Sequence, residues 1–233
     1  MRVVVLLGLN FARTQWIAVA VMMTYLLVIA LVFRSHVQAA DVVFFLRWHA
    51  GYAMFLGMGL AVPVLQLERK TRRVLAVVSK GIYRWQYLGG LLCGCMLIAA
   101  LFCGLIGGIA AWLCQQVGIS SGVLVPVTLA LFCCCVAAAA TGLFFATFLH
   151  PLLATLTTSI VVSLPLVLEA TGRNPVWQLS PIAWMFHFLL NFRLLPSGAE
   201  IWEITAAALL QIVICWVAGA LVFARRDVTI SPE

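Results

Sequence analysis

Residues 85 to 168 contain no Asp, Glu, Lys or Arg, and this feature limits the possible folds more than any other. A helix rises about 1.5 Å per residue, so the run is long enough to cross a ~30 Å hydrocarbon layer several times. Charged residues make up 9% of the whole chain, whereas a soluble domain carries about 25%. We therefore predict an all-α, polytopic helical membrane protein.

Apolar runs predict six transmembrane helices in a single transmembrane domain over residues 1–233. The fourth is expected to end at His150, because Pro151 disfavours a continuing helix. Residues 182–190 are apolar but too short to span a bilayer, and we expect them to be interfacial or re-entrant within an outer loop, 169–203. Residues 1–13 are expected to form an amphipathic segment at the cytoplasmic surface. The predicted spans are about 16–33, 48–64 (preceded by an interfacial stretch, 42–46), 85–113, 123–149, 152–168 and 204–223.

Lys and Arg residues predict the orientation, since cytoplasmic loops carry most of them. In this arrangement ten of the fourteen lie on the side that holds both termini, and four lie on the other side. Both termini are therefore expected in the cytoplasm. The net charge of +7 does not indicate a nucleic-acid partner, because the sequence offers no soluble basic domain to bind one. The eight Cys residues lie in apolar runs without zinc-site spacing, so we expect packing roles and no metal.

Six of the fourteen basic residues fall between residues 69 and 84, directly after the second predicted span. On a helix at 100° per residue, four of them lie within about 60° of one another, with an apolar stripe opposite. This pattern suits an interfacial loop on anionic lipid and equally a docking element for a cytoplasmic partner. Gly81 weakens the helix. The basic face comprises Arg69, Arg73, Lys80 and Arg84, and the stripe comprises Val74, Leu75, Val78 and Ile82.

The order Glu68…Thr71…Leu75…Ser79, followed by Arg84-Trp85-Gln86-Tyr87-Leu88-Gly89, resembles the segment after the second span of ABC-2 type transporter permeases. The C-terminal Phe223-Ala224-Arg225-Arg226-Asp227 resembles the end of that family, and the six-span plan agrees across the chain. The sequence departs from the family pattern at three places. Arg72 and Arg73 crowd the position of a Gly-Thr pair, Gly81 stands where Pro is common, and Gly90 where Lys is usual.

The resemblance implies a permease subunit of an ATP-driven exporter in the bacterial cytoplasmic (inner) membrane, and not an enzyme. Such a subunit works with an ATP-binding cassette subunit and with a second permease copy or a homologous permease. The chain has no G-x-x-x-x-G-K-[ST] phosphate loop, so no cofactor is expected in it, and ATP and Mg are expected on the partner. The competing hypothesis is a non-transport membrane scaffold or accessory subunit. The transported substrate is left open.

By the same resemblance, residues 68–84 would form the cytoplasmic coupling segment. Its basic face would meet acidic residues of the ATPase or membrane lipid, and its stripe would pack into a groove or against neighbouring helices. The substrate path would lie between two protomers, along the second and fifth spans. The coupling residues are Glu68, Arg69, Arg73, Val74, Leu75, Val78, Lys80, Ile82 and Arg84. The path residues are Met54, Phe55, Met58, Thr155, Thr158 and Ser159.

Two further patterns have structural explanations. The stretch GISSG at 118–122 matches a nucleophile elbow, but it falls in a predicted turn, and His150 lies at the other end of the fourth span. Gly90-x-x-x-Gly94 and Gly104-x-x-x-Gly108 in the third span allow close helix approach, and we expect packing within one subunit. No predicted span carries a carboxylate or Lys, which argues against a proton-coupled carrier.

Overall fold

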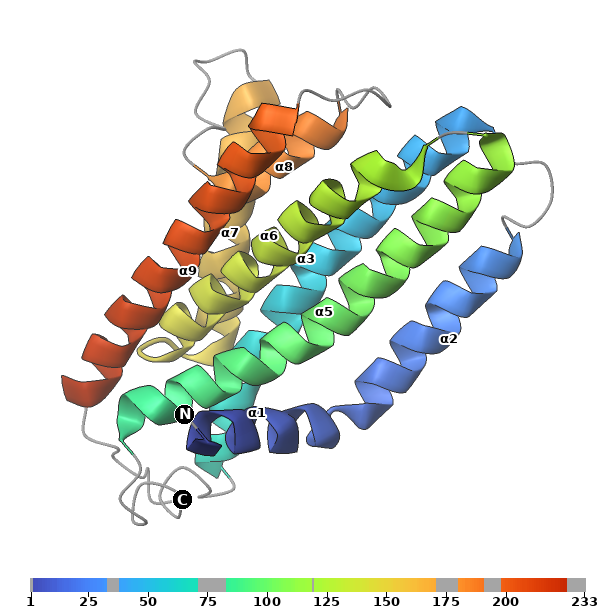
Figure 1. The fold of residues 1–233 in the computed structure, drawn as a ribbon. Coiled ribbons are helices and arrows are strands. Elements are labelled where there is room, and N and C mark those ends of the chain that lie inside the picture. Colours follow the sequence, from blue (N-terminus) through green and yellow to red (C-terminus); the bar gives the residue numbers. More distant parts are fainter. Residues whose placement is uncertain are drawn as a thin grey trace.

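The computed structural model describes residues 2–32, 38–70, 83–118, 120–170, 180–190 and 198–225, and these residues form a helical bundle with no strand among them (Figure 1). In chain order the elements are α1 (Arg2–Thr14), α2 (Trp16–Val32), α3 (Ala39–Lys70), α5 (Arg84–Val117), a 3₁₀ turn (Ser121–Val123), α6 (Leu124–Ala146), α7 (Pro151–Ala170), α8 (Pro181–Leu190) and α9 (Gly198–Arg225).

Four of the described helices are long and apolar enough to cross a membrane, namely α3 over Ala39–Leu65, α5, α6, and α9 from Ala199 onward. The helices α1 and α2 meet this condition only together, as a pair bent by 64°. The apolar stretch Pro151–Leu164 of α7 is shorter than a span. The structure agrees with the predicted all-helical membrane protein, whereas the count of six spans stays a prediction.

Small side chains place α6 at the centre of the bundle, in contact with α3, α5, α7, α8 and α9. Residues 133 to 140 are all Cys, Val or Ala, and all are buried. Small residues let helix backbones approach closely. At Gly57 of α3 the approach is so close that an added Cβ atom would collide with the carbonyl oxygen of Cys135. The Cys135 thiol donates to the carbonyl oxygen of Ala53 at 2.9 Å, so this cysteine packs as the sequence predicts.

One end of the bundle collects α1, the Lys70 end of α3, the Arg84 start of α5 and the Arg225 end of α9 (Figure 1). We call this the basic end. The first residues of α3, α6 and α9 lie at the opposite end, as does α8. Both terminal helices and the two helices that flank the predicted coupling segment therefore meet at the same end of the bundle.

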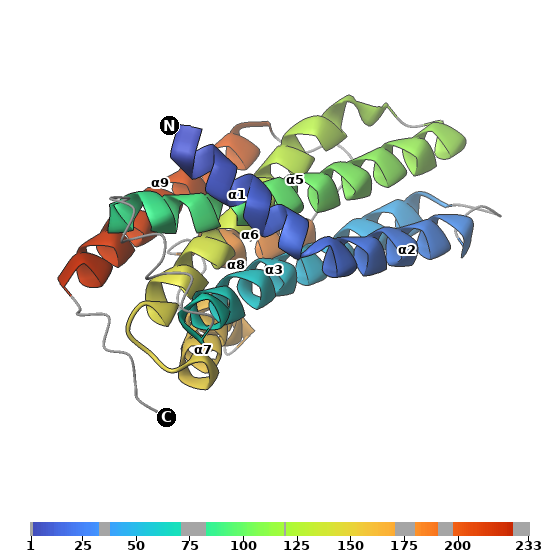
Figure 2. The same cartoon turned by 90° about the horizontal axis from the view of Figure 1, so that it is seen from below.

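The predicted N-terminal amphipathic segment is the helix α1, which lies across the first turns of α5 (Figure 2). Its inner face is buried at Gly8 and Phe11, while Leu6 and Leu9 on its outer face are exposed. An exposed apolar face on a helix beside a membrane span is typical of an interfacial helix. Its position at the cytoplasmic surface of a membrane stays a prediction.

Some helices extend beyond the predicted spans. The predicted span 48–64 and the stretch 42–46 before it belong to one helix, α3, from Ala39 to Lys70. The outer loop 169–203 is interrupted by α8, and its last part belongs to α9, which begins at Gly198. Hydrophobic runs did not predict these helix ends, because the ends carry charged and polar residues. The break at His150-Pro151 is confirmed, since α7 starts at Pro151 and the His150 carbonyl oxygen accepts from the Ala154 amide at 2.8 Å.

Candidate functional site

The predicted coupling segment links the end of α3 to the start of α5 in the sequence. Glu68 and Arg69 belong to the last turn of α3, so the first part of the segment continues that helix. Arg84 is the first residue of α5. The other proposed coupling residues, Arg73, Val74, Leu75, Val78, Lys80 and Ile82, lie outside the described residues.

Arg84 joins the start of α5 to the end of α9. Its Nη1 donates to the carbonyl oxygens of Phe223 at 3.0 Å and Ala224 at 3.1 Å. The last carbonyl groups of a helix lack partners within that helix, and a cation at this end also interacts favourably with the helix dipole. The guanidinium therefore caps α9 from the first residue of α5.

Aromatic rings strengthen the same connection. Trp85 and Trp216 of α9 meet edge to face, with ring centroids 6.2 Å apart. Tyr87 stacks with Phe223 at 6.4 Å. A Cβ atom at Gly89 would lie 3.4 Å from Nε1 of Trp216, so glycine leaves room for this indole ring. We call these contacts, together with the Arg84 hydrogen bonds, the α5–α9 joint.

The next glycines of α5 hold α1. A Cβ atom at Gly90 would lie 2.7 Å from Cβ of Leu7, and one at Gly94 would collide with the ring of Phe11. On the α1 side, a Cβ atom at Gly8 would meet Gly94 and Cys93 at 3.1 Å. The first Gly-x-x-x-Gly pair therefore serves packing within this subunit, as predicted. The stretch 84–90 thus connects three helices, α1, α5 and α9, at the basic end.

The predicted path residues of α3 and α7 fall into two groups. Met54, Met58 and Thr158 are buried inside the single chain. The Thr158 hydroxyl donates to the carbonyl oxygen of Ala154 in its own helix at 2.6 Å. Phe55 is 67% exposed, Thr155 is also exposed, and Ser159 is partly exposed. Only the second group is accessible from outside the chain.

Two polar residues inside the bundle, half-buried Gln211 and buried His49, were missed by the sequence reasoning. Gln211 of α9 donates through Nε2 to the Thr141 hydroxyl of α6 at 2.9 Å. His49 of α3 is 3% exposed. Its Nδ1 lies 2.7 Å from the carbonyl oxygen of Phe45, which can only accept, so Nδ1 carries the proton. Its Nε2 has no hydrogen-bond partner among the described residues.

Side chains of α3, α6 and α9 hold α8 at the opposite end. Arg47 donates through Nε to the carbonyl oxygen of Leu189 at 2.7 Å. The Cys134 thiol lies 3.5 Å from the carbonyl oxygen of Pro181, and Trp184 Nε1 donates to Glu200 at 3.3 Å. Arg47 and Cys134 lie eight and ten residues into their helices, which corresponds to about 12–15 Å at 1.5 Å per residue. The short helix therefore contacts α3 and α6 about two to three turns beyond their first residues.

The described residues offer no group of three His, Cys, Asp or Glu side chains that could hold a metal ion. All eight cysteines are free thiols, and six of them are buried. The stretch at 118–122 is a turn in its described part. Gly118, with φ of 74°, ends α5 in the left-handed conformation, and its amide donates to the carbonyl oxygen of Gln115 at 3.2 Å. Ser120 and His150 flank α6 at its two ends.

Comparison with known proteins found no match: no family model fits the chain, and no curated protein or solved structure is significantly similar to it.

Proposed function

We propose that the chain is the membrane subunit of an ABC exporter of the ABC-2 type, driven by a separate ATP-binding subunit. The proposal rests on one observation above all. The basic segment between α3 and α5 re-enters the bundle through the stretch 84–90, which resembles the family motif and contacts both α1 and α9. A force applied to this segment would reach three helices at once.

In this proposal the segment 68–84 docks on the ATP-binding subunit at the cytoplasmic face. The apolar stripe enters a groove of that subunit, while the basic face meets acidic side chains or lipid phosphates. ATP and Mg stay on the partner chain. Movement of the segment pulls on α3 at Lys70 and on α5 at Arg84, and the α5–α9 joint carries it to the last helix.

A second permease copy, identical or homologous, would complete the substrate path. Phe55 of α3 and Thr155 of α7 are exposed and would line a route between the two subunits. Three of the predicted path residues are buried in the single chain and would support the packing of α3 and α7 behind this route. They are Met54, Met58 and Thr158. We place the chain in the bacterial inner membrane, with six spans and both termini in the cytoplasm.

We further interpret α8 as re-entrant. Its contacts with Arg47 and Cys134 lie about 12–15 Å along α3 and α6 from the first residues of those helices, so α8 would lie beside these helices where they enter the hydrocarbon layer. Backbone groups at that depth need partners within the protein. Arg47 supplies such a partner, because its Nε donates to the carbonyl oxygen of Leu189 in the last turn of α8.

The experiment is a substitution in the apolar stripe. Val78→Asp would place a carboxylate in the proposed hydrophobic contact, where an unpaired charge is strongly unfavourable. We expect loss of the co-purifying ATP-binding subunit and of transport in cells that express the full complex. Val78→Leu should retain both, and Ser79→Asp, which adds the same charge outside the stripe, should have a smaller effect.

The scaffold hypothesis predicts a different result. If no chain with a G-x-x-x-x-G-K-[ST] loop co-purifies with the unmodified protein in mild detergent, the transport proposal is wrong. If such a chain co-purifies but Val78→Asp leaves association unchanged, the segment lies on lipid and does not dock.

A further inference from the structure

The outer face of α1 carries an arginine among apolar side chains. Leu6, Leu9 and Arg13 stand three and four positions apart, so they share one face of the helix, and all three are exposed. The opposite face, with Gly8 and Phe11, packs on α5. Arg13 forms no hydrogen bond or ion pair with another residue that the structure describes. An occupant of the outer face therefore has to accept both apolar side chains and a positive charge.

The direction of α1 places this face at a membrane surface. The helix α2 contacts α5, which is one of the helices that can cross a membrane. The axis of α1 is bent by 64° from that of α2 (Figure 2). A helix that diverges this far from the direction of a span lies closer to the plane of a bilayer than to its normal. We therefore expect α1 to run along the membrane surface at the basic end.

Exposed aromatic side chains mark the same level of the bundle. Trp16 is the first residue of α2, Trp85 is the second residue of α5, and Tyr83 directly precedes α5. All three side chains are exposed. Trp and Tyr concentrate where a membrane meets water, because their rings are apolar and carry one polar group. Both helices therefore begin at the level of the lipid headgroups, and α1, which precedes α2 and contacts α5, lies at that level too.

The charge at this level distinguishes between occupants. Residues 1 to 40 contain no Asp or Glu. A second copy of α1 is a poor occupant, because two faces that carry only arginine charges repel each other. An anionic lipid surface attracts such a face and also accepts its leucines. In α1 and the helix turns at the basic end, the only acidic residue is Glu68, and the basic residues are Arg2, Arg13, Arg69, Lys70, Arg84 and Arg225.

We propose that the outer face of α1 binds anionic phospholipid headgroups of the leaflet at the basic end. Leu6 and Leu9 enter the boundary between headgroups and acyl chains, and the Arg13 guanidinium donates to a lipid phosphate. Phosphatidylcholine satisfies this contact less well, because its own ammonium group balances the phosphate charge. The binding needs only α1 and the bilayer, so it does not depend on the proposed function.

The test uses the full-length chain in nanodiscs of equimolar phosphatidylcholine and phosphatidylglycerol, with benzoylphenylalanine in place of Leu9. Lipid adducts are identified by mass spectrometry after illumination. We expect about five phosphatidylglycerol adducts for each phosphatidylcholine adduct, because one arginine near an anionic surface contributes about 1 kcal/mol. Benzoylphenylalanine in place of Leu210, which is exposed in the middle of α9, is the position control and should label the two lipids equally.

Two further variants isolate the charge. Arg13→Gln should lower the adduct ratio at position 9 to about two or less, whereas Arg13→Lys keeps the charge and should keep most of the enrichment. The fold should tolerate both, because this side chain is exposed. Equal labelling of the two lipids at position 9, or an enrichment that Arg13→Gln leaves unchanged, would overturn the proposal. Crosslinks from position 9 to a protein chain in place of lipid would also overturn it and would assign the face to a partner subunit.

Discussion

Arg84 carries more of the proposed mechanism than any other described residue, because its guanidinium holds the C-terminal carbonyl groups of α9. The sequence predicts its place at the end of a basic helix, but not its partners. Phe223 and Ala224 lie 139 and 140 residues further along the chain. No local pattern specifies a contact of that separation.

Replacement of Arg84 tests this contact. Arg84→Ala removes two charge-assisted hydrogen bonds, and for this partly buried side chain we expect a loss of about 1–2 kcal/mol in stability. Arg84→Lys keeps the charge without the planar fork and should lie between the alanine variant and the wild type. The measurement is thermal unfolding in detergent, combined with hydrogen exchange of the last turn of α9. Unchanged exchange near residues 223–225 in Arg84→Ala would contradict the capping role.

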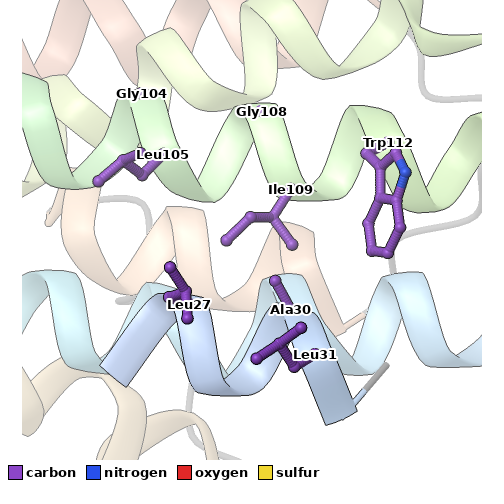
Figure 3. Close-up of a pocket in the computed structure, with 8 residues that line it drawn as sticks. All are labelled: Leu27, Ala30, Leu31, Gly104, Leu105, Gly108, Ile109 and Trp112. Atoms are coloured by element: carbon purple, nitrogen blue, oxygen red, sulfur yellow. The ribbon is translucent and has the colours of Figure 1, made fainter. Parts of the chain in front are cut away.

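Glycine shows what residue patterns can and cannot predict. Both Gly-x-x-x-Gly pairs of α5 indicate close helix approach, and the motif alone gives them equal weight. The structure separates them, since α1 packs on Gly90 and Gly94, whereas Gly104 and Gly108 line an apolar pocket between α2 and α5 (Figure 3) and have no atom within 4 Å of an added Cβ. The difference arises from the direction in which α1 crosses α5, which depends on packing and not on the motif.

At the scale of elements, hydrophobic runs predict the existence of the long helices well and their ends poorly. The continuous helix of α3 includes Asp41 and Arg47 before the predicted start of the span and Glu68 after its predicted end. Charged residues at helix ends lower hydropathy without ending the helix. The sequence predicts α8 as an apolar piece too short to span. Its contacts could not be predicted, because Arg47 and Cys134 lie far from it in the sequence.

The pairing of α6 with α9 leads to a prediction for Thr141. This hydroxyl accepts from Gln211 and donates to the carbonyl oxygen of Ala137. Thr141→Val should destabilise the protein by about 0.6 kcal/mol, the mean for hydrogen bonds between membrane helices, and by no more than about 1.7 kcal/mol, the largest such value. Thr205→Val is a matched control, because buried Thr205 donates to its own helix at Ile201.

The same pair allows a double-mutant cycle. Thr141→Val should have little further effect in a Gln211→Leu background, because the shared hydrogen bond is already lost. Thermal unfolding of the four variants gives the coupling. Strictly additive effects would show that the two helices are held together without this bond.

At the scale of the whole molecule, the described helices bring both terminal helices and the flanks of the basic segment to one end of a membrane bundle. Composition alone predicts the membrane class, because residues 85 to 168 have no charged side chain. The proposed function depends on more than composition. It combines the family resemblance of residues 68–89 with the α5–α9 joint. Through this joint, movement of the segment 68–84 would be transmitted to α9.

The most direct measurement is photocrosslinking from the apolar stripe in living cells. Benzoylphenylalanine replaces Val78 in the full-length chain, and the same residue in place of Val213, which is 55% exposed on α9, serves as control. The account predicts that position 78 crosslinks to a separate chain with a G-x-x-x-x-G-K-[ST] phosphate loop, and that position 213 does not. Crosslinks from position 78 to lipid alone, or access to that position by an impermeant reagent from outside the cell, would contradict it.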